Sequence, residues 1–144
     1  MKLDTFGDLL ILSDHEGRIL LQKNEQTQKY FLPGIKICAG ISITEQLKKY
    51  LTSHCNTFPN HYDFVSVFED VYPVKETIRH DLHFIFKIQD CMMAPDVPAN
   101  LSQCHWKDIS TLPRLGFEPS GLKKDLIEIL KGREIYFTSN VEKV

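Results

Sequence analysis

The sequence lacks a long basic run, a C-x-x-C pair and an apolar segment long enough to cross a membrane. Its 17 Lys and Arg residues nearly balance 19 Asp and Glu residues among 144 positions, so bulk attraction to nucleic acid is not expected. The first apolar run, Leu9 to Leu12, is far shorter than a membrane span. No signal peptide is visible either. These absences predict a cytoplasmic protein that binds neither membrane nor nucleic acid.

The cysteines do not form the pattern of a metal site or of a disulfide framework. They are widely spaced along the chain, at Cys38, Cys55, Cys91 and Cys104. We therefore expect reduced, mostly buried thiols. The length suits one folding unit, so we expect a single domain over 1–144 with terminal tails at 1–5 and 138–144.

What the sequence does contain is a series of strand and helix patterns. Ser42 followed by Glu45 is a capping box, and apolar residues then recur at helical spacing, which predicts a helix from Ile43 to Asn56. Apolar alternation predicts an N-terminal hairpin and a later antiparallel pair that turns at Tyr72–Lys75. The expected strands are 6–13, 18–23, 30–32, 35–38, 62–69, 78–88, 103–107 and 135–137, and a last helix capped by Ser120 spans 121–131. This order predicts an α+β fold with a mixed sheet between helices.

Several short motifs follow one another in an order that resembles the Nudix family. They are Leu32-Pro33-Gly34, Gly40 and Ser42 ahead of the central helix, the strand His80 to Ile88, and Trp106 followed by Leu112-Pro113. The resemblance covers about Phe6 to Lys131 and implies a Nudix-like α/β/α sandwich. Members of that family typically use magnesium or manganese to cleave nucleoside diphosphates linked to another moiety.

The family's signature, G-x5-E-x7-R-E-U-x-E-E-x-G-U with U a bulky aliphatic residue, is degenerate in this chain. With Leu32-Pro33-Gly34 in register, Lys49 takes the place of the arginine and Tyr50 that of the next glutamate. Ser53 and His54 stand where the paired glutamates belong. Magnesium prefers oxygen ligands, carboxylates among them, and phenol, hydroxyl and imidazole groups supply no anionic oxygen at neutral pH. The helix is therefore expected to hold no metal, and we expect no cofactor.

A family-like cleft without the metal could still bind a ligand through residues near this helix. The ligand-binding candidates are Tyr30, Lys36, Lys49, Tyr50, Ser53 and His54. Lysine pairs with phosphate as a point charge, and Tyr30, Phe31 or Trp106 could stack on a base. A structural reading stays open, in which Tyr50 and His54 fill the core and the lysines form a solvated face.

Acidic residues outside the helix give a second set of candidates. These are Glu69, Asp70, Glu76 and Asp81, which could bind magnesium or manganese in an atypical hydrolase. The plainer reading is that they are turn and strand-end acids, because loops collect polar residues. His80 and His83 are three apart on a strand, so they point to opposite faces and cannot share one ion.

The sequence leaves open whether the protein is an enzyme. The favoured interpretation is a Nudix-like module that binds a nucleotide, an ADP-ribose-like ligand or a protein partner, without ordinary metal-dependent hydrolysis. The alternative is a pyrophosphohydrolase that uses carboxylates from outside the signature. The family resemblance also makes a homodimer one option for its assembly.

Overall fold

One long N-terminal strand organises the fold. The computed structural model describes residues 2–54, 61–88 and 104–142, and in it β1 spans Lys2–His15. β1 runs parallel to β6 over most of its length and turns back into β2 as the expected hairpin. The other elements are β2 (Arg18–Lys23), β3 (Tyr30–Phe31), β4 (Gly34–Lys36), α1 (Ile43–His54), β5 (Asp63–Val74), β6 (Thr77–Ile88), β7 (Cys104–Asp108), a 3₁₀ helix (Ile109–Arg114), α2 (Leu122–Leu130) and β8 (Phe137–Val141).

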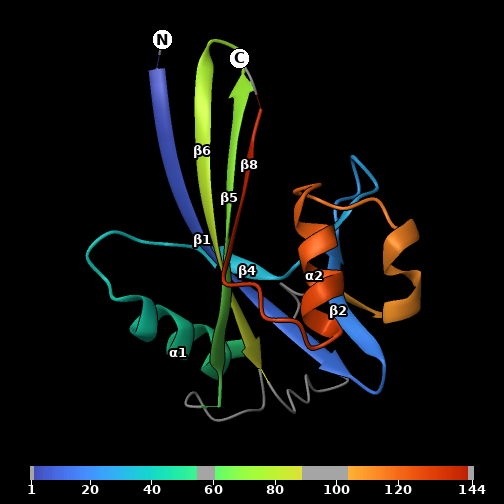
Figure 1. Cartoon of the computed structure of the whole chain (residues 1–144). Coiled ribbons are helices and arrows are strands. Elements are labelled where there is room, and N and C mark those ends of the chain that lie inside the picture. The colour runs from blue at the N-terminus through green and yellow to red at the C-terminus, as the bar shows by residue number, and fades with distance from the viewer. Residues whose placement is uncertain (1, 55–60, 89–103, 143–144) are drawn as a thin grey trace.

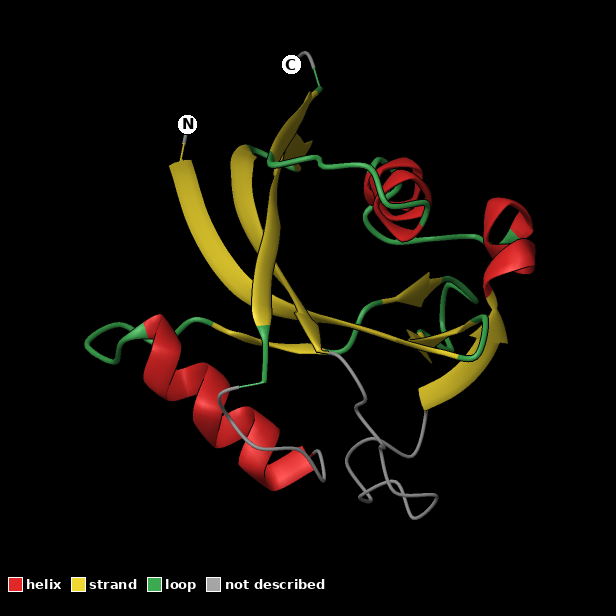
Figure 2. Cartoon of the chain, turned by 60° about the horizontal axis from the view of Figure 1, so that its bottom comes forward, coloured by secondary structure: helices red, strands yellow, loops and turns green. Residues whose placement is uncertain are grey.

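The described strands form one mixed, eight-stranded sheet. Its order is β3-β2-β1-β6-β5-β8, with β4 beside β1 and β7 beside β2. The pairs β1–β6 and β5–β8 are parallel, whereas the other pairs are antiparallel. Figures 1 and 2 show α1 and α2 on opposite sides of this sheet. The expected α+β fold, with a mixed sheet between helices, is confirmed.

The apolar run of β1 is buried because both faces of this strand are covered. Leu9 and Ile11 pack in a core with α1, whereas Leu10 and Leu12 pack in a second core with α2. Successive side chains of a strand point to opposite faces, so four consecutive apolar residues serve two cores. β1 therefore connects the two halves of the molecule.

The turn between β5 and β6 comes later than the sequence predicts. The two strands pair from Asp63 as far as Val74, and Lys75, with a φ of 56°, lies in the turn. Pro73 argues against a strand because it lacks an N–H donor. Here it lies beyond the stretch 67–71 where β8 pairs with β5, so its missing donor interrupts none of the pairs that the described residues of β8 form with β5.

The chain ends also differ from the prediction. Residues 2–5 and 138–141, expected as tails, belong to β1 and β8, and β8 begins at Phe137 rather than Ile135. Polar contacts fix β8: Thr138 donates to Asp125 on α2, and Asn140 donates to Asp70 on β5. Hydrophobic periodicity does not predict such polar contacts between side chains.

The two helices begin in different ways. Ser42 accepts a hydrogen bond from the backbone N–H of Glu45 at 3.2 Å, so the predicted cap of α1 is present. α2 begins after Gly121, and no side chain caps it, so Ser120 is not its cap. Gly132, with a φ of 87°, follows α2 as the sequence predicts. The expected helical residues Cys55 and Asn56 lie outside the described residues.

Two further expectations concern exposure. Cys38 is exposed and Cys104 is half-buried, so Cys38 is not one of the buried thiols expected from the sequence, while Cys55 and Cys91 lie outside the described residues. Among the residues that the structure places, no helix is long and apolar enough to span a membrane.

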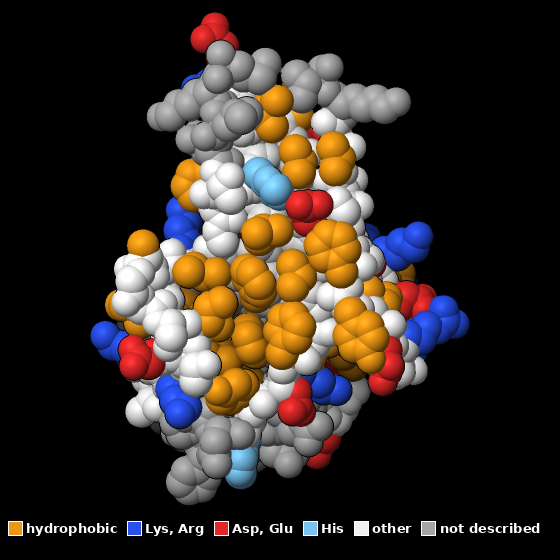
Figure 3. Space-filling model, turned by 60° about the vertical axis from the view of Figure 1, so that its left-hand side comes forward, with side chains coloured by type: hydrophobic (Ala, Val, Ile, Leu, Met, Phe, Trp, Pro, Cys, Tyr) orange, Lys and Arg blue, Asp and Glu red, His pale blue; other side chains and the backbone are white. Residues whose placement is uncertain are grey.

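Part of the sheet face on the side of α1 remains uncovered. Phe64 on β5 is 52% exposed and Phe137 on β8 is 58% exposed, and the Phe64 ring contacts Phe86 edge-on. Figure 3 shows apolar side chains gathered over this face. The opposite face is hollowed instead, and it carries most of the polar residues considered next.

Candidate functional site

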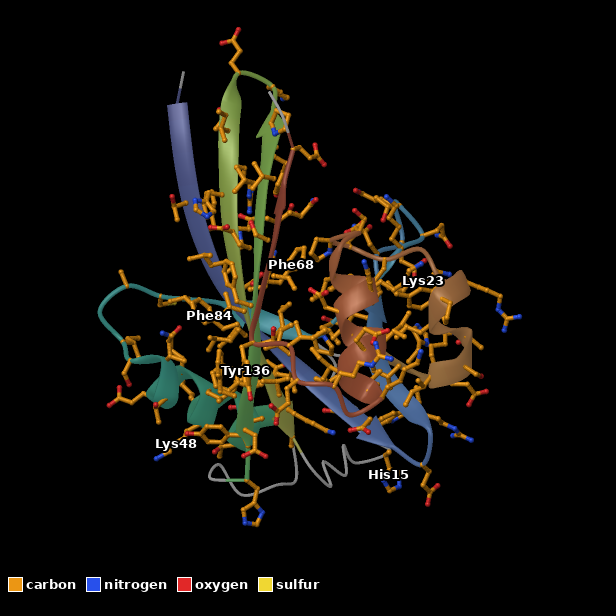
Figure 4. The ribbon with its side chains drawn as sticks, in the orientation of Figure 1. His15, Lys23, Lys48, Phe68, Phe84 and Tyr136 are labelled. Carbon is orange, nitrogen blue, oxygen red and sulfur yellow. The ribbon has the colours of Figure 1, made fainter. Side chains whose placement is uncertain are left out.

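A cleft opens on the sheet face that α2 covers. Its volume is about 400 Å³, within the range of small-molecule sites. Phe68, labelled in Figure 4 between the sheet and α2, belongs to the core on this side. The lining residues are Asp8, Leu10, Phe31, Leu32, Asp70, Tyr72, Asp81, His83, Glu118 and Pro119.

The sheet register brings the polar lining residues together from three strands. Asp8 on β1 stands opposite His83 on β6, and Asp70 on β5 stands opposite Asp81 on β6. Because alternate residues of a strand share a face, Tyr72 and Asp70 face the cleft together. The result is a floor with three carboxyl groups, one imidazole and one phenol.

His83 and Asp8 form a polar pair in the cleft, with the imidazole almost fully buried. His83 Nδ1 lies 2.6 Å from Asp8 Oδ1, and the His83 side chain is only 10% exposed. The Phe68 ring stacks on the imidazole with 6.0 Å between ring centroids. His83 Nε2 is buried and has no hydrogen-bond partner among the described residues.

Asp81 accepts hydrogen bonds from two neighbouring side chains. Its Oδ2 accepts a hydrogen bond from the Tyr72 hydroxyl at 2.7 Å, and its Oδ1 accepts one from Arg79 Nε at 2.9 Å. Burial, together with the bond to Asp81, raises the pKa of Tyr72 to about 12. The phenol therefore stays protonated at neutral pH and acts as a donor to Asp81.

Asp70 has a less favourable environment for its charge. Burial raises the pKa of Asp70, and the hydrogen bond from the Asn140 side chain, at 3.1 Å, opposes this only in part. Burial disfavours the charged form of a carboxyl group. A perturbed carboxyl group in a cleft is a common feature of functional sites.

The outer walls of the cleft are apolar on one side and basic on another. Phe31, Leu32 and Pro119 line one wall. At the Asp8 end, two cations lie against the Phe6 ring, with Lys36 Nζ 5.9 Å and the Arg79 guanidinium carbon 4.2 Å from its centroid. A smaller hollow joins this rim to Asp8 and Asp81. The cleft thus has an acidic floor and a basic rim.

The structure resembles solved structures of one fold. A mutator MutT protein from Bacillus halodurans aligns with a TM-score of 0.67 and 17% identity over 94% of this chain and 90% of its own. A MutT NUDIX hydrolase from Burkholderia pseudomallei aligns at 0.65 and 13% identity, over 85% and 97%. A C. elegans Ap4A hydrolase aligns at 0.56 and 10% identity, over 90% and 98%. The chain has the Nudix fold. No family model and no curated protein matches its sequence.

The residues on α1 do not fit the metal that the Nudix fold implies. Lys49 and Ser53 are exposed on this helix, and Tyr50 is buried against Leu9 and Leu47. None of these side chains offers a carboxylate to magnesium. Within 2–54, 61–88 and 104–142, no group of three His, Cys, Asp or Glu side chains is arranged to hold a metal ion.

The ligand-binding candidates from the sequence are not brought together in this cleft. Of the six, Lys36 lies at its basic rim, whereas Lys49 and Ser53 face solvent on α1. Tyr50 packs in the core, as the structural reading proposes. The side chain of His54 lies outside the described residues.

Tyr30 holds a wall of the cleft in place without lining it. Its backbone N–H donates to Gly116 and its carbonyl accepts from Glu118, both at 2.9 Å. Its ring lies 5.8 Å from Lys23 Nζ and 5.2 Å from Lys107 Nζ. The neighbouring Phe31 lines the cleft instead.

The four acidic candidates separate into two groups. Asp70 and Asp81 meet across β5 and β6 in the cleft. Glu69 lies on the other face, where it accepts from Ser139 at 2.7 Å and its Oε2 lies 2.7 Å from His80 Nε2; these contacts lower its pKa. Glu76 is exposed in the turn after β5. His80 and His83 point to opposite faces, as expected.

Sequence reasoning missed Asp8, His83 and Glu118 as parts of the site. His83 and Asp8 are 75 positions apart in the chain, and only the parallel pairing of β1 with β6 makes them neighbours. One signal was available: Asp8 and His83 each interrupt a strand that is otherwise mostly apolar. A polar residue within a buried strand usually has a partner.

Proposed function

We propose that this protein binds a nucleotide-type ligand in the cleft and does not cleave it by the ordinary metal-dependent route. The observation that carries the proposal is the division of the cleft into an acidic floor, at Asp8 and Asp70, and a basic rim, at Lys36 and Arg79. A nucleotide has the matching division, with a donor-bearing heterocycle at one end and phosphates at the other.

Charge decides the direction in which such a ligand lies. A phosphate beside the carboxylates of the floor would be repelled, because like charges a few ångströms apart interact unfavourably in a partly desolvated site. At the rim, phosphate meets the ammonium of Lys36, and the nearby guanidinium of Arg79, which donates to Asp81 at 2.9 Å, offsets the charge of that carboxylate. The heterocycle then lies between Phe31 and the polar floor.

The composition of α1 supports the second half of the proposal. Tyr50, Ser53 and His54 stand where the family signature has glutamates, which would carry negative charge. Without carboxylates at these three positions of the helix, a hard divalent cation has few ligands beyond the substrate itself. The protein would then recognise its ligand directly through side chains.

Calorimetric titration of the purified protein with AMP, ADP, ADP-ribose and diadenosine tetraphosphate tests the proposal. The last compound is a natural probe because one structure of the same fold is an Ap4A hydrolase. We expect binding without added metal and no products after incubation with magnesium or manganese. Turnover at an ordinary enzymatic rate contradicts the absence of hydrolysis, and no binding of any compound favours a protein-binding scaffold.

A pair of lysine variants locates the ligand. Lys36→Gln removes the charge at the rim, and we expect it to weaken binding of phosphate-bearing compounds about tenfold. Lys49→Gln makes the same change on the exposed face of α1 and serves as the matched control, with no expected effect. The reverse pattern would place the ligand beside α1 and contradict the proposed orientation.

An atypical hydrolase remains the second candidate, favoured by the pairing of Asp70 with Asp81 across β5 and β6. It requires these two carboxyl groups to share a cation, although Asp81 already accepts from Tyr72 and Arg79. Manganese titration followed by electron paramagnetic resonance separates the candidates. One bound ion that Asp70→Asn abolishes would support the hydrolase.

A further inference from the structure

The hydrogen bond to Asp8 determines which nitrogen of His83 carries the proton. An ionised carboxylate has only acceptor atoms. Since His83 Nδ1 lies 2.6 Å from Asp8 Oδ1, Nδ1 carries the hydrogen and donates it. In the neutral imidazole, Nε2 is then left with a lone pair and acts as an acceptor.

Within the described part of the protein, this lone pair accepts no hydrogen bond. Nε2 is buried, and none of the described residues gives it a hydrogen bond. The ring is held on both sides, by Asp8 at Nδ1 and by Phe68 stacked on its face. A buried acceptor without a partner is unfavourable, and here it belongs to a residue that lines a cleft of ligand size.

We infer that His83 Nε2 accepts a hydrogen bond from a donor on the ligand's heterocycle. The hydrogen bond to Asp8 keeps the proton on Nδ1, so that Nε2 acts as the acceptor. The inference rests on the proposed function and specifies its ligand class: bases that present an exocyclic amino group to the floor. Asp70, on the adjacent strand, supplies a second acceptor beside His83. Nε2 has almost no exposed area, so the ligand reaches it after rotation of a lining side chain that is only half-buried, such as Phe31 or Glu118.

Matched nucleotides test the inference. AMP is compared with purine riboside monophosphate, which lacks only the exocyclic amino group, and GMP is compared with IMP in the same way. In each pair we expect the amino-bearing compound to bind about tenfold more tightly, the size of one good hydrogen bond.

Three variants connect this preference to Nε2. His83→Asn keeps a donor to Asp8 near the position of Nδ1 but removes the acceptor at Nε2, so the preference should fall to about one. His83→Gln can place an amide oxygen near Nε2 and should keep part of the preference. His80→Asn, on the same strand but on the opposite face, serves as the control and should leave the preference unchanged.

Nitrogen NMR of the imidazole gives a readout that does not depend on ligand affinity. The free protein at neutral pH should show a protonated Nδ1 and an unprotonated Nε2 for His83. A proton on Nε2 instead overturns the inference, and so does equal binding within both nucleotide pairs.

Failure of this inference and failure of the proposed function look different. If nucleotides bind but His83→Asn keeps the full preference for the amino group, only the proposed hydrogen bond to Nε2 is wrong. If no nucleotide binds to a folded protein, both are wrong. Far-UV circular dichroism of each variant ensures that a lost preference is not a lost fold.

Discussion

At the scale of single residues, the strands constrain each position by what stands opposite it. Gly34 on β4 shows this most directly, because a Cβ atom at this position would lie 2.1 Å from the Leu9 carbonyl oxygen. No side-chain rotation relieves a contact with backbone. The close approach of β4 to β1, and with it one side of the cleft, therefore depends on glycine.

Gly34→Ala is expected to destabilise the protein by about 3 kcal/mol, the upper part of the range for overpacking. The measurement is the midpoint of urea unfolding. Gly116→Ala is the matched control, since its Cβ would meet the flexible Lys29 side chain at 3.3 Å. Equal midpoints for the two variants would show that β4 can move away from β1 at little cost.

Asp70 should make stability depend on pH in an identifiable direction. Its pKa is raised in the folded protein from the ordinary value of 3.8, mainly by burial. The folded state then binds a proton more tightly than the unfolded state, so the contribution of Asp70 is most favourable below about pH 3.8 and is lost as pH rises through the folded pKa.

Asp70→Asn removes this titration while keeping an acceptor for Asn140. The variant should gain stability relative to the natural protein as pH rises from about 3.8 toward neutrality. Urea unfolding at several pH values measures the difference, which also cancels the opposite effect of Glu69, whose pKa is lowered. A difference that does not change with pH would contradict burial of a charged Asp70.

At the scale of elements, side-chain hydrogen bonds fix segments that apolar patterns leave undefined. The loop before α1 is one such segment. Gln46 is buried on α1; its Oε1 accepts from the Cys38 N–H at 2.9 Å, and its Nε2 donates to the Ile41 carbonyl at 2.8 Å. One side chain thus ties the loop 38–41 to the first turn of the helix.

Gln46→Ala should cost about 1–3 kcal/mol, because it removes two hydrogen bonds of a buried side chain, each of which contributes about 0.5–1.5 kcal/mol. Glu45→Ala, at an exposed neighbouring position of the same turn, should cost much less. Urea unfolding compares the two, and hydrogen exchange of the Cys38 amide should accelerate in the Gln46 variant alone. An unchanged exchange rate would mean that the loop is held by something else.

β8 is the second segment of this kind. Thr138 donates to the buried Asp125 of α2, whereas Ser139, next to it, donates to Glu69 on the other face.

Thr138→Val keeps the shape of the side chain but leaves Asp125 with an unpaired oxygen, so we expect a loss of about 1–3 kcal/mol of stability. Ser139→Ala, the control, should change the unfolding midpoint little, since its partner is less buried. Similar effects of both would contradict the docking of β8 through Thr138.

These two segments also show where sequence reasoning stops. The central strand and the start of α1 are encoded locally, by four consecutive apolar residues and by Ser42 with its capping bond, and both were predicted. β8 and the floor of the cleft depend on pairings such as Thr138 with Asp125 and His83 with Asp8, which join separate elements. A single sequence holds the partners but not the register that brings them together.

At the scale of the whole molecule, β1 couples two cores that lie on opposite faces of the sheet. Leu47 on α1 packs in one core with Leu9, and Leu126 on α2 packs in the other with Leu10. Because Leu9 and Leu10 are adjacent, neither core can lose its strand without disturbing the other. The protein should therefore unfold in one cooperative transition.

The single tryptophan makes this cooperativity measurable. Trp106 lies on β7, which pairs with β2. Figure 1 shows β2 and α1 at opposite sides of the molecule. Leu47→Ala and Leu126→Ala should each cost about 2–5 kcal/mol. If the molecule unfolds as one unit, Leu47→Ala shifts the urea midpoint of Trp106 fluorescence and of far-UV circular dichroism by the same amount. A dichroism shift without a fluorescence shift would show that the α1 half unfolds alone. The cleft is built from β1, β5 and β6 together. It would then lack the single rigid frame that selective binding requires.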